Sequence, residues 1–134
     1  MSLVDDKRQF LKSVIGLPKA LASQREIPLA HSLCQLVVTT REAVIIPDTS
    51  RHPLVCSNPA FSDLDVRAYA GVPLSTSVGH VLGALCVIES TPRAWTTHEL
   101  EVLRDIAAGI MSEIDLRSKT IVKVSQRTSK TAKL

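Results

Sequence analysis

The clearest pattern along the chain is a pair of extended apolar runs, Ala68–Ser75 and His80–Glu89, joined by the polar segment Thr76–Gly79. Two such runs with a glycine between them predict neighbouring antiparallel strands. The second run has too few polar residues to alternate between a buried and a solvated side. We therefore expect it to lie in the middle of a sheet with both of its faces buried.

Shorter patterns precede this hairpin. Turn-forming residues at Asp5–Lys7 separate the apolar stub Leu3–Val4 from Arg8–Leu17, which we read as a strand. Apolar residues recur at helical spacing in Leu29–Val38, which predicts a helix. Glu42–Ile46 predicts a short buried strand that ends at a proline.

A long polar segment, Thr49–Asp65, separates that strand from the hairpin and is rich in proline, serine and aspartate. This composition predicts a loop with at most a short helix near Pro53–Ser57. Loops of this length inside compact domains are usually functional.

The best-defined helix begins at Thr96. Thr96 and Glu99 have the spacing of a capping box, in which the hydroxyl accepts from the third amide and the carboxylate reaches back to the N–H of the cap. Trp95 and Leu100 take the two positions of a hydrophobic staple. The apolar stripe that follows is broad enough to contact both the sheet and a partner helix; it comprises Leu100, Leu103, Ala107, Ile110 and Ile114, widened by Val102, Ile106 and Met111.

This order of elements predicts an α+β fold with one central antiparallel sheet and helices packed on one face. The 134 residues suffice for a single domain with its own core. We assign residues 1–117 to that domain. Residues 118–134, part of a stretch from Arg117 with six basic and no acidic residues, are expected to form a basic polar tail or the stump of a linker.

Composition limits the partners and the compartment. No apolar run approaches the ~20 residues of a membrane span, so no membrane contact is expected. The tail lacks aromatic residues for base stacking, which argues against nucleic acid. The three cysteines are odd in number and scattered, which favours reduced thiols and a cytoplasmic location.

The residues that carry chemistry form no catalytic or metal-binding pattern. The four histidines are isolated, and the glycines have no phosphate-binding spacing. Cys34 and Cys86 lie in apolar segments and are expected to pack in the core, whereas Cys56 lies in the polar loop as the most exposed thiol. Tyr69 has two open interpretations, as a core residue or as part of a pocket lining.

Several segments, taken in order, resemble the GAF domain family over about residues 4 to 117. The resemblance is closest to the bacterial branch attached to histidine kinases, PP2C-type phosphatases and cyclic-di-nucleotide enzymes. The segments that carry it are Asp6–Phe10, Leu29–Gln35, Val44–Asp48, His52–Val55, Asn58-Pro59, Tyr69–Leu74, Gly79–Val87, Pro92–Thr96 and Glu99-Leu100.

The resemblance implies a GAF-like (profilin-like) sheet with helices on one side and a pocket for a small molecule or other signal on the other, beneath Thr49–Asp65. Carried over by position, the pocket lining would include Cys34, Phe61, Tyr69 and Val72. The Asn-Lys-Phe-Asp pattern of the cyclic-nucleotide-binding members is absent, as is a counterpart of the chromophore-attaching Cys-His pair. The ligand and any cofactor therefore stay unknown.

The family begins with an additional helix and a complete first strand, whereas only Met1–Val4 precedes the first turn here. We interpret the chain as N-terminally incomplete, with the missing strand in the middle of the sheet. The missing helix would cover part of the apolar stripe on the last helix. We expect a second copy to cover that stripe, which gives a homodimer through the terminal helices.

The resulting functional prediction is a non-catalytic sensory or regulatory domain of a bacterial signal-transduction protein, such as a two-component system. Its terminal helix would pass the signal to an effector domain or partner protein. One alternative is a dimerisation module without a ligand. Another is a cysteine-based methionine sulfoxide reductase, for which Cys34 and Cys56 are the candidate thiols if Cys86 is buried.

Overall fold

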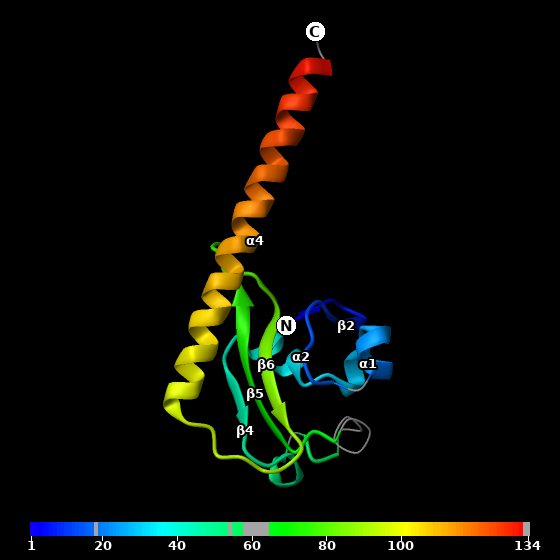
Figure 1. The fold of residues 1–134 in the computed structure, drawn as a ribbon, viewed down its shortest axis with the longest axis vertical. Helices are drawn as coiled ribbons and strands as arrows, with labels where there is room; N and C mark the ends of the chain where they lie inside the picture. Colours follow the sequence, from blue (N-terminus) through cyan, green and yellow to red (C-terminus); the bar gives the residue numbers. More distant parts are fainter. Residues whose placement is uncertain (18, 54, 58–64, 133–134) are drawn as a thin grey trace.

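The computed structural model describes residues 1–17, 19–53, 55–57 and 65–132 (Figure 1). Its strands are β1 Ser2–Val4, β2 Arg8–Leu11, β3 Glu26–Pro28, β4 Val44–Ile46, β5 Ala68–Ser75 and β6 Val81–Glu89. Its α-helices are α1 Lys19–Gln24, α2 Cys34–Thr40 and α4 Thr97–Ala132, and two short 3-10 helices are η1 Leu29–His31 and η2 Thr49–Arg51.

The six strands form one antiparallel sheet in the order β3-β2-β1-β6-β5-β4. The predicted hairpin is confirmed as β5 and β6, with Tyr69 opposite Ile88 and Gly71 opposite Cys86. The pairing becomes irregular between Leu74 and Ser75, just before the turn. The α+β class and the antiparallel sheet are therefore as the sequence predicted.

The N-terminal stub takes a place in the middle of the sheet. Residues Ser2–Val4 form β1 between β2 and β6. Gly83 of β6 permits this pairing, because a Cβ atom there would lie 1.9 Å from the carbonyl oxygen of Ser2 and 2.8 Å from the Cα of Leu3. The absence of a side chain at this position lets the two backbones approach.

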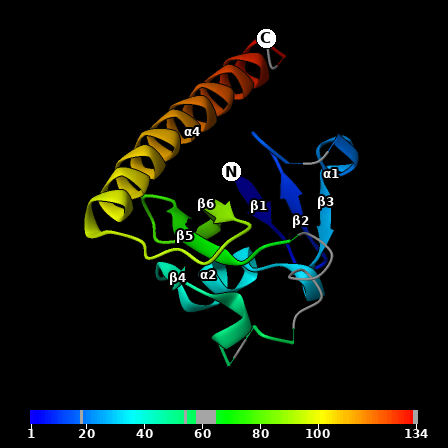
Figure 2. The ribbon, with the colours of Figure 1, turned by 60° about the horizontal axis from the view of Figure 1, so that its bottom comes forward.

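The helices are divided between the two faces of the sheet, which differs from the expected packing on one face (Figure 2). Successive residues of a strand point to opposite sides, and β5 contributes to both cores. Tyr69 belongs to an apolar cluster with Cys34 and Val37 of α2. Ala70 belongs to a second cluster with Leu103 of α4. We call these sides the α2 face and the α4 face.

The last helix starts as predicted, with one changed hydrogen bond. The backbone N–H of Glu99 donates to the Thr96 hydroxyl at 3.1 Å. The capping box predicts that the Glu99 carboxylate accepts from the backbone N–H of Thr96. It instead accepts from the Thr96 hydroxyl at 3.2 Å and from Arg93 at 3.0 Å. Trp95 and Leu100 both pack on the α4-face cluster, as a staple requires.

Helix α4 packs on the sheet along its first half only. Leu103, Ala107 and Met111 are buried there, while Val102 and Ile106 stay 41% and 50% exposed. The helix then continues as one element to Ala132, well past the end of the sheet (Figure 1). The part predicted as a tail is thus helical from residue 118 to that point.

Strand β6 lies in mid-sheet as predicted, but the expected burial of both its faces is wrong. Leu82, Val87 and Ile88 are each more than a third exposed. The reason is that α4 lies mainly over β5 and reaches little of β6. On the other face, α2 is too short, at seven residues, to cover the whole nine-residue strand.

The predicted strand Arg8–Leu17 ends early, at Leu11. The chain bends away there because the amides of Lys12 and Ser13 both donate to the carbonyl oxygen of Met1. Gly16 then takes a positive φ of 81°, which a strand does not allow. The predicted strand Glu42–Ile46 is likewise shorter and begins at Val44.

The predicted helix Leu29–Val38 is divided into η1 and α2. Ser32 between them has extended backbone angles, and its side-chain oxygen accepts from the backbone N–H of Gln35 at 3.1 Å. This bond gives a backbone N–H in the first turn of α2 an acceptor, and it favours the start of a new helix here over a continuous helix. Within Thr49–Asp65, the short helix expected near Pro53–Ser57 is found earlier, as η2; residues 54 and 58–64 lie outside the described residues.

Candidate functional site: a buried thiol centre

Polar side chains from four strands and one helix meet on the α2 face. Cys34 comes from the first turn of α2, Tyr69 from β5 and Cys86 from β6. Ser2 of β1 and Gln9 of β2 complete the group. The pairing registers bring them together, because Ser2 pairs with Ala84 and therefore points to the same side as the next alternate residue, Cys86. We call these five residues the thiol centre.

The Cys34 sulfur is the hub of the thiol centre. The Tyr69 hydroxyl donates to it at 3.2 Å and the Gln9 side-chain N–H at 3.3 Å. The Ser2 hydroxyl lies 3.4 Å away and the Cys86 sulfur 3.7 Å away. Cys34 is only 1% exposed, so these contacts stand in place of water.

Gln9 fixes the position of the Cys34 side chain through a chain of hydrogen bonds. Its side-chain oxygen accepts from the Ser32 hydroxyl at 2.5 Å, and its N–H also donates to Ser2 at 3.0 Å. Since Ser32 accepts in turn from the first turn of α2, the start of the helix and strands β1 and β2 belong to one network. Buried polar groups that are mutually satisfied in this way fix a single geometry.

This surrounding sets the ionisation of the thiols. The Cys86 thiol above all, with the hydroxyls of Ser2 and Tyr69, lowers the pKa of Cys34 to about 7, although burial acts in the opposite direction. The pKa of Cys86 is raised, first by its hydrogen bond to the thiol that ionises first and then by desolvation of its own thiol group, although the residue as a whole is half-buried. Burial raises the pKa of Tyr69, and the neighbouring thiols raise it further. The arrangement favours a Cys34 thiolate beside a neutral Cys86 thiol.

Gly71 makes room for the tyrosine. A Cβ atom at this position would lie 2.3 Å from the Tyr69 hydroxyl. Gly71 is also the partner of Cys86 in the pairing of β5 with β6. The Tyr69 side chain therefore lies along its own strand and brings its hydroxyl to the cysteines.

An apolar shell closes over the thiol centre. Its buried members are Leu33, Val37, Ile46, Val55, Val66 and Ala84. Val55 lies in the long loop and Val66 directly follows it, and the Thr49 hydroxyl at the start of the loop donates to the carbonyl oxygen of Val66 at 2.9 Å. The described part of the loop thus packs directly on the sheet over Tyr69.

Of the four predicted pocket residues, Cys34 and Tyr69 come together in the thiol centre. Phe61 lies outside the described residues. Val72 does not join them, because it points to the α4 face and packs with that cluster. Cys56 is exposed, as the sequence predicted. The thiol next to Cys34 is that of Cys86, which corrects the pairing of Cys34 with Cys56 considered for an enzyme.

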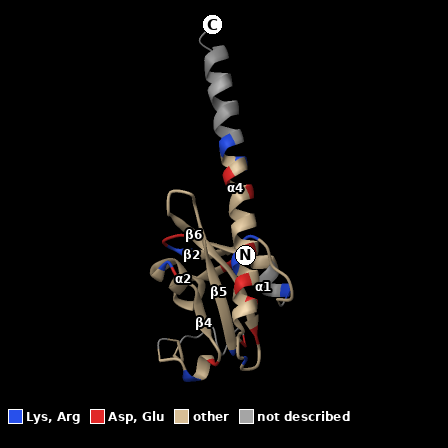
Figure 3. Cartoon of the chain, turned by 90° about the vertical axis from the view of Figure 1, so that its left-hand side faces the viewer, with Lys and Arg blue, Asp and Glu red and all other residues tan. Residues whose placement is uncertain are grey.

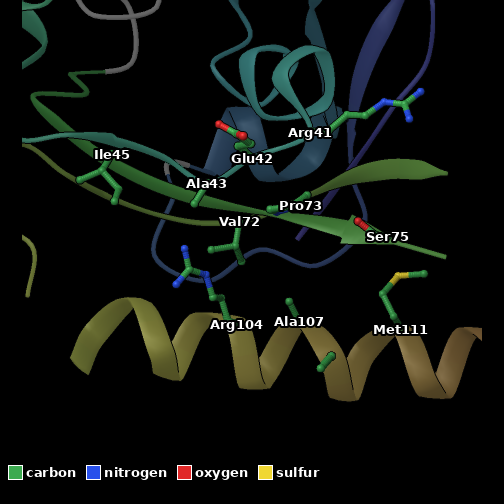
Figure 4. Close-up of a pocket in the computed structure, with 11 residues that line it drawn as sticks. Arg41, Glu42, Ala43, Ile45, Val72, Pro73, Ser75, Arg104, Ala107 and Met111 are labelled. Carbon is green, nitrogen blue, oxygen red and sulfur yellow. The ribbon is translucent and has the colours of Figure 1, made fainter. Parts of the chain in front are cut away.

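A shallow groove lies on the opposite face, between α4 and the β4–β5 edge of the sheet (Figure 4). Val72 of β5 lines one side, and Arg104, Ala107 and Met111 of α4 line the side opposite, with Arg104 extending toward the sheet. A second hollow lies on the outer side of the loop and is lined by Pro47, Asp48, Arg51, His52, Pro53, Pro92, Arg93 and Ala94.

Positively and negatively charged residues are interspersed along the described part of α4 (Figure 3). They include the ion pair of Arg117 with Glu113, at 3.1 Å. Among the described residues, no helix is both long enough and apolar enough to cross a membrane. Within the same residues, no three His, Cys, Asp or Glu side chains are grouped so as to hold a metal ion.

A six-stranded antiparallel sheet with a long C-terminal helix on one face and a small enclosed centre on the other defines a class of compact α+β domain. The chain belongs to the GAF domain family, whose sequence pattern matches residues 4–114. The family assignment made from the sequence is thereby confirmed.

One relative is a cyclic di-GMP phosphodiesterase of Pseudomonas aeruginosa, which is 30% identical over 125 residues. The match covers 91% of this chain but 20% of the relative. The chain therefore spans about one fifth of the length of this relative.

Solved structures with this fold include a GAF domain of a phosphotransferase and a free methionine-R-sulfoxide reductase. The GAF domain of an Acinetobacter phosphoenolpyruvate-protein phosphotransferase has a TM-score of 0.69 at 21% identity and covers 89% of this chain and 70% of its own. The type II free methionine-R-sulfoxide reductase of Thermoplasma acidophilum has a TM-score of 0.65 at 18% identity and covers 83% and 73%. The fold alone does not decide whether a member is catalytic.

Proposed function

We propose that this chain is a non-catalytic sensory or regulatory domain of a bacterial signal-transduction protein in the cytoplasm. It binds a small molecule or receives another signal, and passes the resulting change through α4 to an effector domain or a partner protein. The observation that carries this proposal is α4 itself, a 36-residue helix that begins on the sheet and runs on beyond it (Figure 1). A helix of this form is suited to carry a change from the domain to an attached effector or a partner protein.

Strand β5 provides the connection between signal and helix. Tyr69 belongs to the thiol centre, while its neighbours Ala70 and Val72 pack against α4. A ligand that displaces β5 on the α2 face therefore changes the surface on which α4 rests. Transmission requires that the signal favour one of two positions of the helix.

The relative supports a regulatory role. A chain that matches one fifth of a cyclic di-GMP phosphodiesterase is expected to be one module among others. In such an arrangement the module supplies control, and the catalytic step belongs to another part of the protein.

A second copy of the chain is proposed as a partner. Val102 and Ile106 on α4 and Val87 on β6 are exposed on the α4 face. Together they leave apolar surface uncovered beside the terminal helix. We expect a homodimer through the terminal helices, and light scattering that shows a monomer at tens of micromolar would contradict it.

A ligand screen tests the sensory proposal. Thermal unfolding is measured with nucleotides, cyclic dinucleotides, amino acids and small organic acids; a ligand at a hundred times its Kd adds about 2.7 kcal/mol to the stability. Hydrogen exchange of α4 is then compared with and without the ligand. We expect a stabilising ligand that also changes exchange in α4. A panel without any shift would favour the alternative of a dimerisation module without a ligand.

The contact between Cys34 and Cys86 favours one catalytic alternative, a cysteine-based methionine sulfoxide reductase. Two thiols at 3.7 Å provide an attacking and a resolving group. We expect no turnover of free methionine sulfoxide with a thiol reductant. Turnover that is lost in Cys34→Ser and in Cys86→Ser, but kept in Cys56→Ser, would overturn the non-catalytic proposal.

A further inference from the structure

The Cys34–Cys86 pair has features that neither packing nor ligand binding requires. A cysteine that serves as a small core hydrophobe needs no hydrogen-bond donors. Here the donors converge on Cys34 from Tyr69 and Gln9, and a second sulfur lies within 3.7 Å. Thiolates are stabilised by such donors, and the thiolate is the reactive form of cysteine.

We infer that Cys34 and Cys86 form a redox site that hydrogen peroxide converts into an intramolecular disulfide between α2 and β6. This inference goes beyond the proposed sensory role and does not depend on it. The oxidant is identified by the size of the site. Cys34 is 1% exposed, while Cys86 is half-buried on a strand that is incompletely covered. Only a small oxidant can approach from that side.

The reaction balances with one peroxide. The Cys34 thiolate attacks one oxygen of hydrogen peroxide, the O–O bond breaks, and the departing hydroxide takes a proton to become water. Cys34 is now a sulfenic acid. The Cys86 sulfur then attacks the Cys34 sulfur, the S–O bond breaks, and the hydroxyl leaves as a second water with the Cys86 proton. Two thiols are thus oxidised by two electrons in all, and one peroxide is reduced.

The geometry needs only a local adjustment. The sulfurs must approach from 3.7 Å to the disulfide length of about 2.05 Å. Cys34 lies in the first turn of α2, directly after the irregular segment Ser32–Leu33, so the helix needs to move only at this end. Once Cys34 is oxidised, Tyr69 and Gln9 lose a thiolate acceptor, so the change reaches β5 and β2 as well.

The central experiment uses the full chain with Cys56→Ser, which removes the exposed thiol and leaves the pair intact. We expect stoichiometric hydrogen peroxide to lower the intact mass by two hydrogen atoms. Peptide mapping without reductant should join the Cys34 and Cys86 peptides, and dithiothreitol should restore the starting mass. Glutathione disulfide at the same concentration should react far more slowly, because it is too large for the site.

Two variants in the same background show whether each sulfur has its assigned role. Cys86→Ser should gain oxygen at Cys34 without forming a disulfide. Tyr69→Phe keeps the ring but removes a donor, so oxidation should be several-fold slower near neutral pH and its pH profile should move to higher pH. The titratable groups around Cys34 that enter this profile are Cys86, Tyr69 and, more remotely, the amino group of Met1.

Circular dichroism and thermal unfolding identify any variant that is not folded, and the Cys56→Ser protein remains decisive because its pair is unchanged. The inference is overturned if both thiols of the folded Cys56→Ser protein stay free under peroxide that oxidises Cys56 in the unaltered chain. It is equally overturned if Cys34 proceeds to sulfinic acid while Cys86 stays reduced, or if the disulfide forms only after the protein is unfolded.

Discussion

The two faces of the sheet are built on different physical principles, although β5 and β6 contribute to both. The α2 face surrounds a hydrogen-bonded thiol centre with an apolar shell, at whose edge Cys86 is half-buried. The α4 face is held by an apolar cluster that includes Leu74 of β5 and Leu103 of α4, and it is partly open beside the helix. Hydrogen bonds fix direction, whereas apolar contacts do not. The first face is therefore suited to specific chemistry, and the second permits a helix to shift on the sheet.

The largest expected effect is the difference in stability between truncating a buried side chain and truncating an exposed one on the α4 face. Leu74→Ala removes a side chain that is fully buried under α4 and leaves a cavity. We expect a loss of about 2–5 kcal/mol in the free energy of unfolding, measured by urea denaturation. The matched control is Val102→Ala on the exposed side of the same helix, measured in dilute samples in which the chain is a monomer, where it should change stability by less than about 0.5 kcal/mol.

If the two substitutions cost the same, α4 would not rest on β5 as described. Under the proposed homodimer, the cost of Val102→Ala should rise as the protein concentration is raised into the range where two copies associate. The comparison therefore also examines the proposed homodimer.

The next effect concerns the strand that both faces share. Gly83→Ala places a methyl group against the backbone of β1, and β1 must then move away from β6. We expect a loss of about 1–3 kcal/mol, as for other overpacked sites. Gly109→Ala in α4 is the control, because a Cβ there meets nothing within 4 Å. It should instead stabilise the protein by about 0.5–1 kcal/mol, since alanine favours the helix.

A third substitution tests whether the α2 face depends on its polar centre. Gln9→Leu keeps the approximate size of a side chain that is 4% exposed and makes it apolar. It removes the acceptor of the Ser32 hydroxyl and a donor to Cys34. We expect a loss of about 1–2 kcal/mol, because buried polar groups are left without partners. A gain in stability would show that the thiol centre is ordinary hydrophobic packing.

Much of the fold was predictable because its signals are local. The alternating and continuous apolar runs identified β5 and β6, and the Thr96 and Glu99 spacing placed the start of α4. The division of the helices between the faces was not predictable, since the broad stripe on α4 fits either face. The end of β2 depends on bonds from Lys12 and Ser13 to Met1, which lie outside any local pattern.

The candidate site was predictable in part for the same reason. Cys34 and Tyr69 followed from the family resemblance, but the role of Cys86 depends on its register opposite Gly71. Counting back from the turn does not give this register, because the pairing of β5 with β6 shifts between Leu74 and Ser75. A shift of one residue would move Cys86 to the other face of the sheet. Ser2 and Gln9 carry no signal in the sequence, because each looks like a surface residue until the strands are paired.

The smallest expected effect concerns the point where α4 leaves the loop. Thr96→Ala removes the acceptor of the Glu99 backbone N–H and should cost about 1 kcal/mol, the usual value of an N-terminal cap. The neighbouring Thr97→Ala is the matched control, since Thr97 is already the first helical residue and is exposed. It should cost no more than a few tenths of a kcal/mol. Equal effects in thermal unfolding would mean that the Arg93 contacts with Glu99, rather than the cap, hold the start of the helix.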